Sequence, residues 1–210
     1  MEVFFEIYLL EFLKNRILVK IFLKTKYMAY ITKQFLENYK SKTKFTIHDS
    51  KSLFESIDMD FDVYDIFISY SSKDLEYVKK LAQYLIDSDF SVYVDDNDSI
   101  LDKNNVTEET AKRLAKIMDS CKCLIYVFTK NSVESSWCPW EIGYMSASNN
   151  FKCAVLPIID KTEQYIEHRE YLLIYPKVEH YISLNNGDSY FYVKMQDRIK
   201  LKDYIFDNYD

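Results

Sequence analysis

Glycine and proline are scarce in this sequence, which has 2 Gly and 3 Pro among 210 residues. So few glycines exclude the glycine-rich dinucleotide fingerprint and the phosphate-binding P-loop, because both motifs depend on glycines at fixed spacing. A nucleotide would therefore have to bind through a different motif. Aromatic residues are abundant, with 19 Tyr and 14 Phe, and we do not interpret them as a binding surface.

Positive charge is also in short supply. The chain has 27 Lys and Arg against 33 Asp and Glu, which gives a net charge of −6 at pH 7. Sequence-independent binding of nucleic acid requires clustered Lys and Arg, so this balance argues against a nucleic-acid partner. The length suits one domain of ordinary size with extensions and a large core.

Long apolar runs are missing as well. Charged residues interrupt the apolar residues 1–27, so no stretch approaches the roughly 20 residues of a membrane span. The segment also lacks the basic start and the small-residue cleavage site of a secretory signal. Met28 opens a sensible N-terminus, and we expect residues 1–27 to be an accessory or interfacial helix, or sequence upstream of the true start.

Cysteine is limited to four residues, which form no CxxC pair and no zinc-binding quartet with the three histidines: Cys121, Cys123, Cys138 and Cys153. We therefore predict no metal site. Reduced, mostly buried thiols in a cytoplasmic protein are the expected state. Nothing around Cys138 indicates a lowered pKa, so a nucleophilic role for this thiol is not expected.

The order of the predicted elements indicates an α/β fold. Five short, β-rich runs predict strands, at residues 63–70, 90–94, 123–128, 154–159 and 180–184. Helical patterns lie between them, including one that a capping box of Ser71 and Asp74 would start and one that begins at Thr107. Strands that alternate with helices predict a central parallel sheet with helices on both faces.

The remaining residues flank this alternating core. We predict an N-terminal helical extension and linker at residues 1–60, with a helix at residues 32–39 that Thr32 caps. The domain itself is predicted at residues 61–210, including a C-terminal extension. Within it, residues 161–175 look helical, and a short closing element is expected near residues 201–206.

The segment at residues 131–146 (NSVESSWCPWEIGYMS) is the expected centre of the chemistry. Ser135 or Ser136 can cap a helix here, because a side-chain oxygen satisfies a backbone N–H of the first turn. Trp137 and Glu141 are four residues apart, so a helix places the ring and the carboxylate on one face. A buried strand at residues 123–128 leads into this helix.

Other polar residues converge on the same edge of the predicted sheet. In an open α/β sheet, ligands bind outside the carboxyl ends of the strands. Tyr70 and Ser71 end the first predicted strand, and Asp95 and Asp96 end the second. Together with the Trp–Glu pair, these side chains suit a ligand with a ring, a diol and a phosphate.

Four ordered motifs carry a resemblance to a known family: YDIFISYSSKD at residues 64–74, FSVYVD at 90–95, NVTEETA at 105–111 and SSWCPWEIGYM at 135–145. They resemble the TIR (Toll/interleukin receptor) domain. The pattern is most similar to bacterial TIR proteins of the kind found in Thoeris anti-phage systems. The resemblance implies the flavodoxin-like, three-layer TIR fold, with a central parallel five-stranded sheet flanked by helices.

The resemblance also implies an activity and a set of site residues. In enzymatic TIR domains the catalytic glutamate lies in a WxxxE pattern, which Trp137 and Glu141 match. Tyr70, Ser71 and Asp95 would join Trp137 in binding the substrate. That substrate is NAD+, whose nicotinamide–ribose bond is cleaved, and no separate cofactor is implied. The product in the Thoeris-like subgroup is a cyclic ADP-ribose isomer, a diffusible signal that activates an effector protein.

Two other functions compete with this enzyme. One is a non-catalytic TIR interaction module that self-associates with other TIR domains through its loops. The presence of Glu141 within WxxxE favours the enzyme, because a scaffold has no need of that carboxylate. The other is a nucleoside deoxyribosyltransferase-like enzyme on a similar sheet, with a glutamate as covalent nucleophile.

Overall fold

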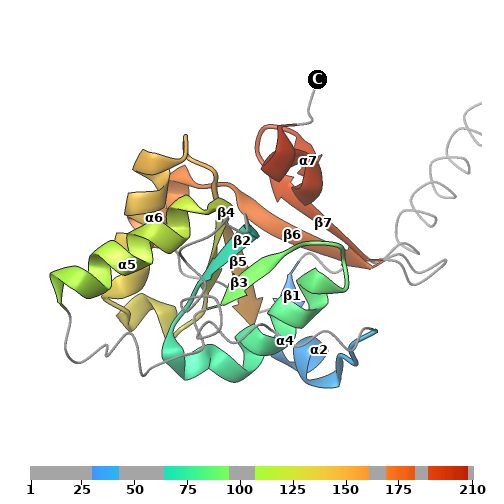
Figure 1. The fold of residues 1–210 in the computed structure, drawn as a ribbon. Helices are drawn as coiled ribbons and strands as arrows, with labels where there is room; N and C mark the ends of the chain where they lie inside the picture. The colour runs from blue at the N-terminus through green and yellow to red at the C-terminus, as the bar shows by residue number, and fades with distance from the viewer. Residues whose placement is uncertain (1–29, 43–63, 95–106, 161–168, 183–188, 208–210) are drawn as a thin grey trace, which may run out of the picture.

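A computed structural model describes residues 30–42, 64–94, 107–160, 169–182 and 189–207 of the chain. Its centre is one eight-stranded sheet with the order β3-β2-β4-β5-β6-β7-β8, and β1 pairs with β5 off this path. The strands are β1 (Ile31–Thr32), β2 (Tyr64–Ser69), β3 (Val92–Val94), β4 (Cys121–Phe128), β5 (Cys153–Ile159), β6 (Lys177–Ile182), β7 (Ser189–Lys194) and β8 (Arg198–Lys200). Helices cover both faces of the sheet (Figure 1).

Five parallel strands form the main part of the sheet, in the order β3-β2-β4-β5-β6. Counted along these five strands alone, the order is 2-1-3-4-5, which is the flavodoxin-like arrangement. Each of the five overlaps a strand predicted from the sequence. The predicted α/β class and its parallel, helix-flanked sheet are therefore confirmed.

The sheet extends beyond the five predicted strands. β7 pairs antiparallel with β6, β8 pairs antiparallel with β7, and the two-residue β1 runs parallel to β5. In β7 the buried Phe191 and Val193 alternate with more exposed residues. That alternation is typical of an antiparallel strand with one solvated face. Through β1, residues 30–42 join the same sheet as the rest of the fold.

Helices and short 3₁₀ turns connect the strands: α2 (Lys33–Asn38), η1 (Ser72–Asp74), α4 (Leu75–Ile86), α5 (Glu108–Asp119), η2 (Ser132–Glu134), α6 (Trp137–Ser148), η3 (Glu170–Ile174) and α7 (Leu201–Phe206). Two predicted caps are confirmed. Thr32 accepts a hydrogen bond from the Phe35 N–H at 3.0 Å, and Thr107 accepts one from the Thr110 N–H at 3.2 Å. Of the helix expected at 161–175, residues 161–168 lie outside the described residues and the remainder contains η3.

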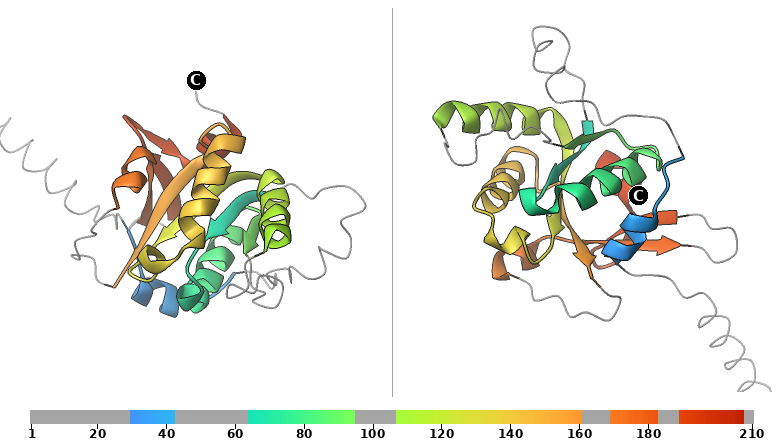
Figure 2. Two further views of the ribbon diagram at one scale, coloured as in Figure 1. Left: turned by 90° about the vertical axis from the view of Figure 1, so that its left-hand side faces the viewer. Right: turned by 90° about the horizontal axis from the view of Figure 1, so that it is seen from below.

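The sheet buries one apolar cluster on each face, and β4 contributes to both. Cys123, Ile125 and Val127 belong to the cluster covered by α2, α4 and α7. Leu124 and Tyr126 belong to the cluster covered by α5 and α6. Figure 2 shows the two sets of helices on either side of the sheet. A strand buried on both faces explains the continuous apolar run in its sequence.

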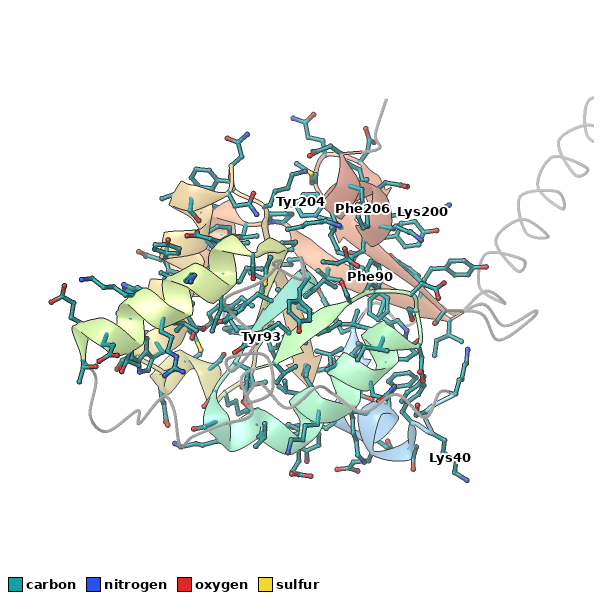
Figure 3. All side chains as sticks on the ribbon, viewed as in Figure 1. Lys40, Phe90, Tyr93, Lys200, Tyr204 and Phe206 are labelled. Atoms are coloured by element: carbon teal, nitrogen blue, oxygen red, sulfur yellow. The ribbon has the colours of Figure 1, made fainter. Side chains whose placement is uncertain are left out.

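Helix α7 lies at the amino ends of the central strands. The Tyr204 hydroxyl donates to the Cys153 carbonyl at 3.1 Å, and the Lys122 ammonium lies 4.2 Å from the centre of the Phe206 ring. In Figure 3, Tyr204 and Phe206 lie at the opposite end of the molecule from Lys40, which follows α2. The carboxyl ends of the strands therefore lie away from α7. None of the helices in the described part of the chain is long and apolar enough to cross a membrane.

His180 of β6 is buried in the α4-side cluster, with 1% of its surface exposed. Its Nε2 pairs with the Tyr84 hydroxyl at 2.5 Å, whereas Nδ1 is buried without a hydrogen-bond partner. The rings of Phe35 and Phe191 lie 5.2 and 5.1 Å away. This burial lowers the pKa of His180 to about 4, so the folded protein favours the neutral ring.

Acid is therefore expected to destabilise the fold through His180. The unfolded chain binds this proton near pH 6.5 and the folded chain only near pH 4, so the unfolded state takes up more protons in between. The free energy of unfolding should fall by about 2 kcal/mol between pH 7 and pH 5 from this residue. Urea denaturation at both pH values, with His180→Phe for comparison, measures the contribution. Equal losses in both proteins would contradict the prediction.

Candidate functional site

The carboxyl ends of the parallel strands lie along one edge of the sheet, where β2 ends at Ser69 and β3 at Val94. Tyr70 and Ser71 directly follow β2 at this edge, as the sequence predicts. Asp95 would be the next residue after β3, but it lies outside the described residues. Its place in the site stays a prediction.

Helix α6 starts at the same edge, and Ser135 fixes its first turn. The Ser135 hydroxyl accepts a hydrogen bond from the Cys138 N–H at 3.3 Å. Ser136 occupies the N-cap position but forms no side-chain cap bond. Pro139 is the third residue of the helix, where its missing N–H breaks no helical hydrogen bond. Of the two predicted caps, Ser135 is the one that makes the bond.

Glu141 lies on the inner side of α6, and only 9% of its surface is exposed. The Ser69 hydroxyl at the end of β2 donates a hydrogen bond to Glu141 Oε2. Cys138 and Ile142, on the same helix, are buried in the core at 0% and 1% exposure and hold α6 against the sheet. The carboxylate is therefore fixed beside the carboxyl end of β2 by a buried contact.

Ser69 was not predicted from the sequence as a site residue. This serine lies inside a β-rich run, where it gave no signal of its own. In the strand its side chain shares a face with Phe67, which packs in the cluster of α5 and α6. Only the packing of α6 against that face reveals that Ser69 meets Glu141.

Trp137 lies one helical turn before Glu141 and is half-buried. Its ring meets Trp140 edge to face, with ring centres 5.5 Å apart, and Trp140 stacks on Tyr144 at 5.6 Å. The Tyr144 hydroxyl donates to the Asp119 carboxylate of α5. This aromatic row supports the predicted packing roles of Trp140 and Tyr144. It also places the Trp137 indole ring at the end of the row, one helical turn before Glu141.

Tyr70 and Ser71 are buried, each with 7% of its surface exposed. The Tyr70 ring belongs to the cluster on the α4 side of the sheet, whereas α6 packs in the other cluster. Ser71 occupies the N-cap position of η1, but its side chain forms no cap bond. The predicted capping box with Asp74 is therefore wrong. The carboxylate of Asp74 instead binds donors on the loop after β4.

The sequence also matches the pattern of a known domain family. The pattern of the TIR domain family covers residues 66–198, from β2 to the start of β8. The chain belongs to the TIR domain family. The matched region contains both Ser69 and Glu141.

Two bacterial relatives have names that state an activity. The protein ThsB′ of Bacillus cereus (strain MSX-D12), named as a probable 3′ cyclic ADP-D-ribose synthase, is 37% identical over 134 residues. That alignment covers 61% of this chain and 69% of ThsB′. A protein of Cytobacillus dafuensis, provisionally named cyclic ADP-D-ribose synthase TIR2, is 36% identical over 84 residues, which are 39% of this chain and 22% of TIR2. This TIR chain therefore corresponds to a minor part of TIR2.

A solved structure also resembles the fold. The crystal structure of the TIR domain of the Toll-related receptor TRR-2 from Hydra magnipapillata aligns with 54% of this chain and 83% of its own. The sequence identity is 16% and the TM-score is 0.38. A likeness of this size adds nothing to the family assignment, which rests on the sequence pattern.

The cysteine thiols of this TIR domain are buried in the core. All four cysteines are reduced thiols, outside any disulfide, and all four are buried, as expected. Burial raises the pKa of Cys121 to about 12 and that of Cys153 to about 11. Cys138, next to Trp137, is fully buried. In the described ranges, no group of three or more His, Cys, Asp or Glu side chains is arranged to hold a metal ion.

Removal of the Ser69 hydroxyl is expected to destabilise the fold through Glu141. The Ser69→Ala variant should lose about 1–3 kcal/mol of unfolding free energy, because a buried carboxylate loses a donor. With Glu141→Ala already present, the same change should have little further effect, and urea denaturation of the four proteins measures this coupling. The exposed Ser136, which makes no cap bond, provides the control: Ser136→Ala should stay within about 0.5 kcal/mol of the wild type. If the effects of Ser69→Ala and Glu141→Ala on the unfolding free energy were additive, the predicted coupling between Ser69 and Glu141 would be wrong.

The native thiols should resist modification. Because they are buried, we expect Ellman's reagent to label none of them within minutes in the folded protein at pH 8. All four should react once the protein is unfolded in guanidinium. Rapid labelling of one thiol in the folded protein would contradict the burial of that thiol.

Proposed function

We propose that this TIR domain cleaves the nicotinamide–ribose bond of NAD+ and closes the remaining ADP-ribose into a cyclic product. The observation that carries the proposal is the buried Glu141, held by Ser69 at the carboxyl edge of a parallel sheet. Ligands bind at this edge in open α/β sheets. The names of ThsB′ and TIR2 as cyclic ADP-D-ribose synthases support the same reaction.

The chemistry of NAD+ explains why one carboxylate is enough. Nicotinamide is a cationic ring in NAD+ and leaves as a neutral molecule. The bond between the ribose C1′ and the ring nitrogen breaks, and its electron pair stays on the nitrogen. Positive charge then develops on the ribose. No general acid is required, in contrast to glycosidases that use two carboxylates.

Glu141 is proposed to stabilise this developing positive charge. A preorganised charge is more effective in a buried site than in water. The hydrogen bond from Ser69 fixes the orientation of this carboxylate. A hydroxyl of the adenosine then forms a new bond to C1′ and releases its proton to water. Proximity lets this hydroxyl outcompete water, whose attack would give linear ADP-ribose instead.

The other predicted residues are assigned to substrate binding. Trp137, on the α6 side of the sheet, would provide stacking surface for a ring of NAD+. Tyr70, whose ring is buried on the α4 side, would shape the substrate site from the end of β2. Ser71 would offer a hydroxyl at the end of β2, and Asp95 would position a substrate hydroxyl or the loop that follows β3. NAD+ is the substrate in this proposal, and the reaction uses no separate cofactor.

The proposal extends to two further partners. The cyclic product would diffuse to an effector protein in an anti-phage response, so the two proteins need not touch. The second proposed partner is another copy of this TIR domain, with which the chain would self-associate. The side chains of Leu173 and Ile174 on η3 are 65% and 68% exposed and supply apolar surface for such a contact.

Replacement of the carboxylate tests the enzyme directly. Glu141→Gln keeps the size of the side chain but removes its charge, so NAD+ consumption should fall by at least about 100-fold. Chromatography with mass detection would follow NAD+, nicotinamide, linear ADP-ribose and cyclic product, at high protein concentration and with lysate from phage-infected cells. The exposed Glu109 on α5 gives a matched control, and Glu109→Gln should consume NAD+ like the wild type.

Other outcomes of this experiment point to the other functions. If wild type and Glu141→Gln were equally inert with every activator, the non-catalytic interaction module would replace the enzyme. Turnover of nucleosides without loss of NAD+ would indicate the deoxyribosyltransferase-like reaction. Either result would overturn the proposal.

A further inference from the structure

Two chain segments border the carboxyl edge of the sheet and contact each other there. The first, residues 70–74, leads from β2 into α4, and the second, residues 129–135, leads from β4 into α6. The carboxylate of Asp74 joins them. Its Oδ2 accepts a hydrogen bond from the Thr129 hydroxyl at 2.5 Å, and its Oδ1 accepts one from the Asn131 side-chain amide at 2.7 Å.

Asp74 is more deeply buried than its position at a helix start would require. Only 1% of its surface is exposed, although it occupies the N-cap position of α4 without making a side-chain cap bond. An ionised carboxylate is costly to bury, and neutral side chains on the neighbouring segment donate these two hydrogen bonds to it. The carboxylate is therefore used for the connection between segments and not for the helix.

The Thr129 end of this connection is itself tightly bonded. The Thr129 hydroxyl accepts hydrogen bonds from the backbone N–H groups of Asn131 and Ser132, both at 3.1 Å. The Ser132 hydroxyl accepts from the Thr129 N–H at 2.9 Å and donates to the Thr129 carbonyl at 3.0 Å. The contact between Asp74 and Thr129 therefore also restrains the turn at residues 129–132, which leads toward α6.

A second contact joins the same two segments at the surface. The Lys73 ammonium lies 2.7 Å from the Glu134 carboxylate, and both side chains are more than 60% exposed. Exposed ion pairs contribute little to stability, because water screens them and two long side chains must be ordered. The buried contact of Asp74 is therefore the stronger connection.

We infer that Asp74 is a positioning residue that locks together the two segments bordering the Glu141 site. One segment carries Tyr70 and Ser71 and continues from Ser69, and the other carries Ser135, which caps α6. Locked segments hold NAD+ in a single pose in which an adenosine hydroxyl reaches C1′. This inference rests on the proposed function, but the lock itself is a property of the fold that can be measured without substrate.

Loosening the lock should affect substrate binding and product choice more than the carboxylate chemistry. Helix α6 keeps its place through Cys138, Ile142 and Met145, all buried in the core. Glu141 therefore remains beside Ser69 when the segments move. A less restrained substrate binds more weakly, and water competes better with the adenosine hydroxyl.

Three variants test the lock. Asp74→Asn replaces one of the two acceptor oxygens by an amide donor, which then faces one of the two donors. Thr129→Val removes the hydroxyl that bonds to Asp74 with little change in shape. For Asp74→Asn and for Thr129→Val we expect the KM for NAD+ to rise about tenfold. This factor corresponds to the loss of one hydrogen bond to a charged group. The ratio of linear to cyclic ADP-ribose should rise as well. Thr129→Ser keeps the hydroxyl and should restore both values.

Asp65 provides a matched control at the other end of β2. It is buried as well, at 8% exposure, and accepts a hydrogen bond from the Ser91 N–H while it pairs with Lys122, each at 2.9 Å. Asp65→Asn should therefore destabilise the fold but leave KM and the product ratio of the folded protein unchanged. Equal changes in Asp65→Asn and Asp74→Asn would overturn a specific positioning role.

Hydrogen exchange separates this inference from the proposed function. In Asp74→Asn, which leaves the Thr129 acceptor in place, the amides of Asn131 and Ser132 should exchange at least about tenfold faster, and in Asp65→Asn they should not. Faster exchange without any NAD+ turnover by the wild type would refute the proposed function and retain the lock. Turnover by the wild type, with unchanged exchange in folded Asp74→Asn and unchanged KM and product ratio in folded Thr129→Val, would refute the lock.

Discussion

The hydrogen bond from Ser69 to Glu141 is the contact on which the functional interpretation depends. It joins the end of a central strand to the second turn of α6, across a distance of 72 residues in the sequence. A buried carboxylate needs a partner, and a hydroxyl supplies one that leaves the negative charge intact. The sheet and the helix must therefore both be in place before the site can exist.

The two edges of the parallel sheet are used differently. At the amino edge, α7 packs on the starts of the central strands through Tyr204 and Phe206, and Asp65 pairs with Lys122. At the carboxyl edge, two connecting segments meet around Asp74 and the Glu141 helix begins. Buried carboxylates occur at both edges. Only those at the carboxyl edge lie where an α/β sheet binds ligands.

Much of the fold could be predicted from the sequence, because its signals are local. The apolar runs predicted the five parallel strands, and Thr32 and Thr107 marked helix starts that the structure confirms. The strand β7 was missed because its pairing with β6 is not a local property. Ser69 and Asp74 were missed or misassigned for the same reason. A strand serine and a cap-like aspartate acquire their roles from partners on α6 and on the loop after β4.

In the proposed reaction, Ser69 affects NAD+ through Glu141. The most direct test measures nicotinamide release by mass detection for Ser69→Ala, once with Glu141 present and once in Glu141→Gln. With Glu141 present, loss of the hydroxyl should slow release by about tenfold or more, and in the Glu141→Gln background it should change the residual rate little. If Ser69→Ala reduced the rate by the same factor in both backgrounds, the two residues would act independently. That result would contradict an effect of Ser69 through Glu141.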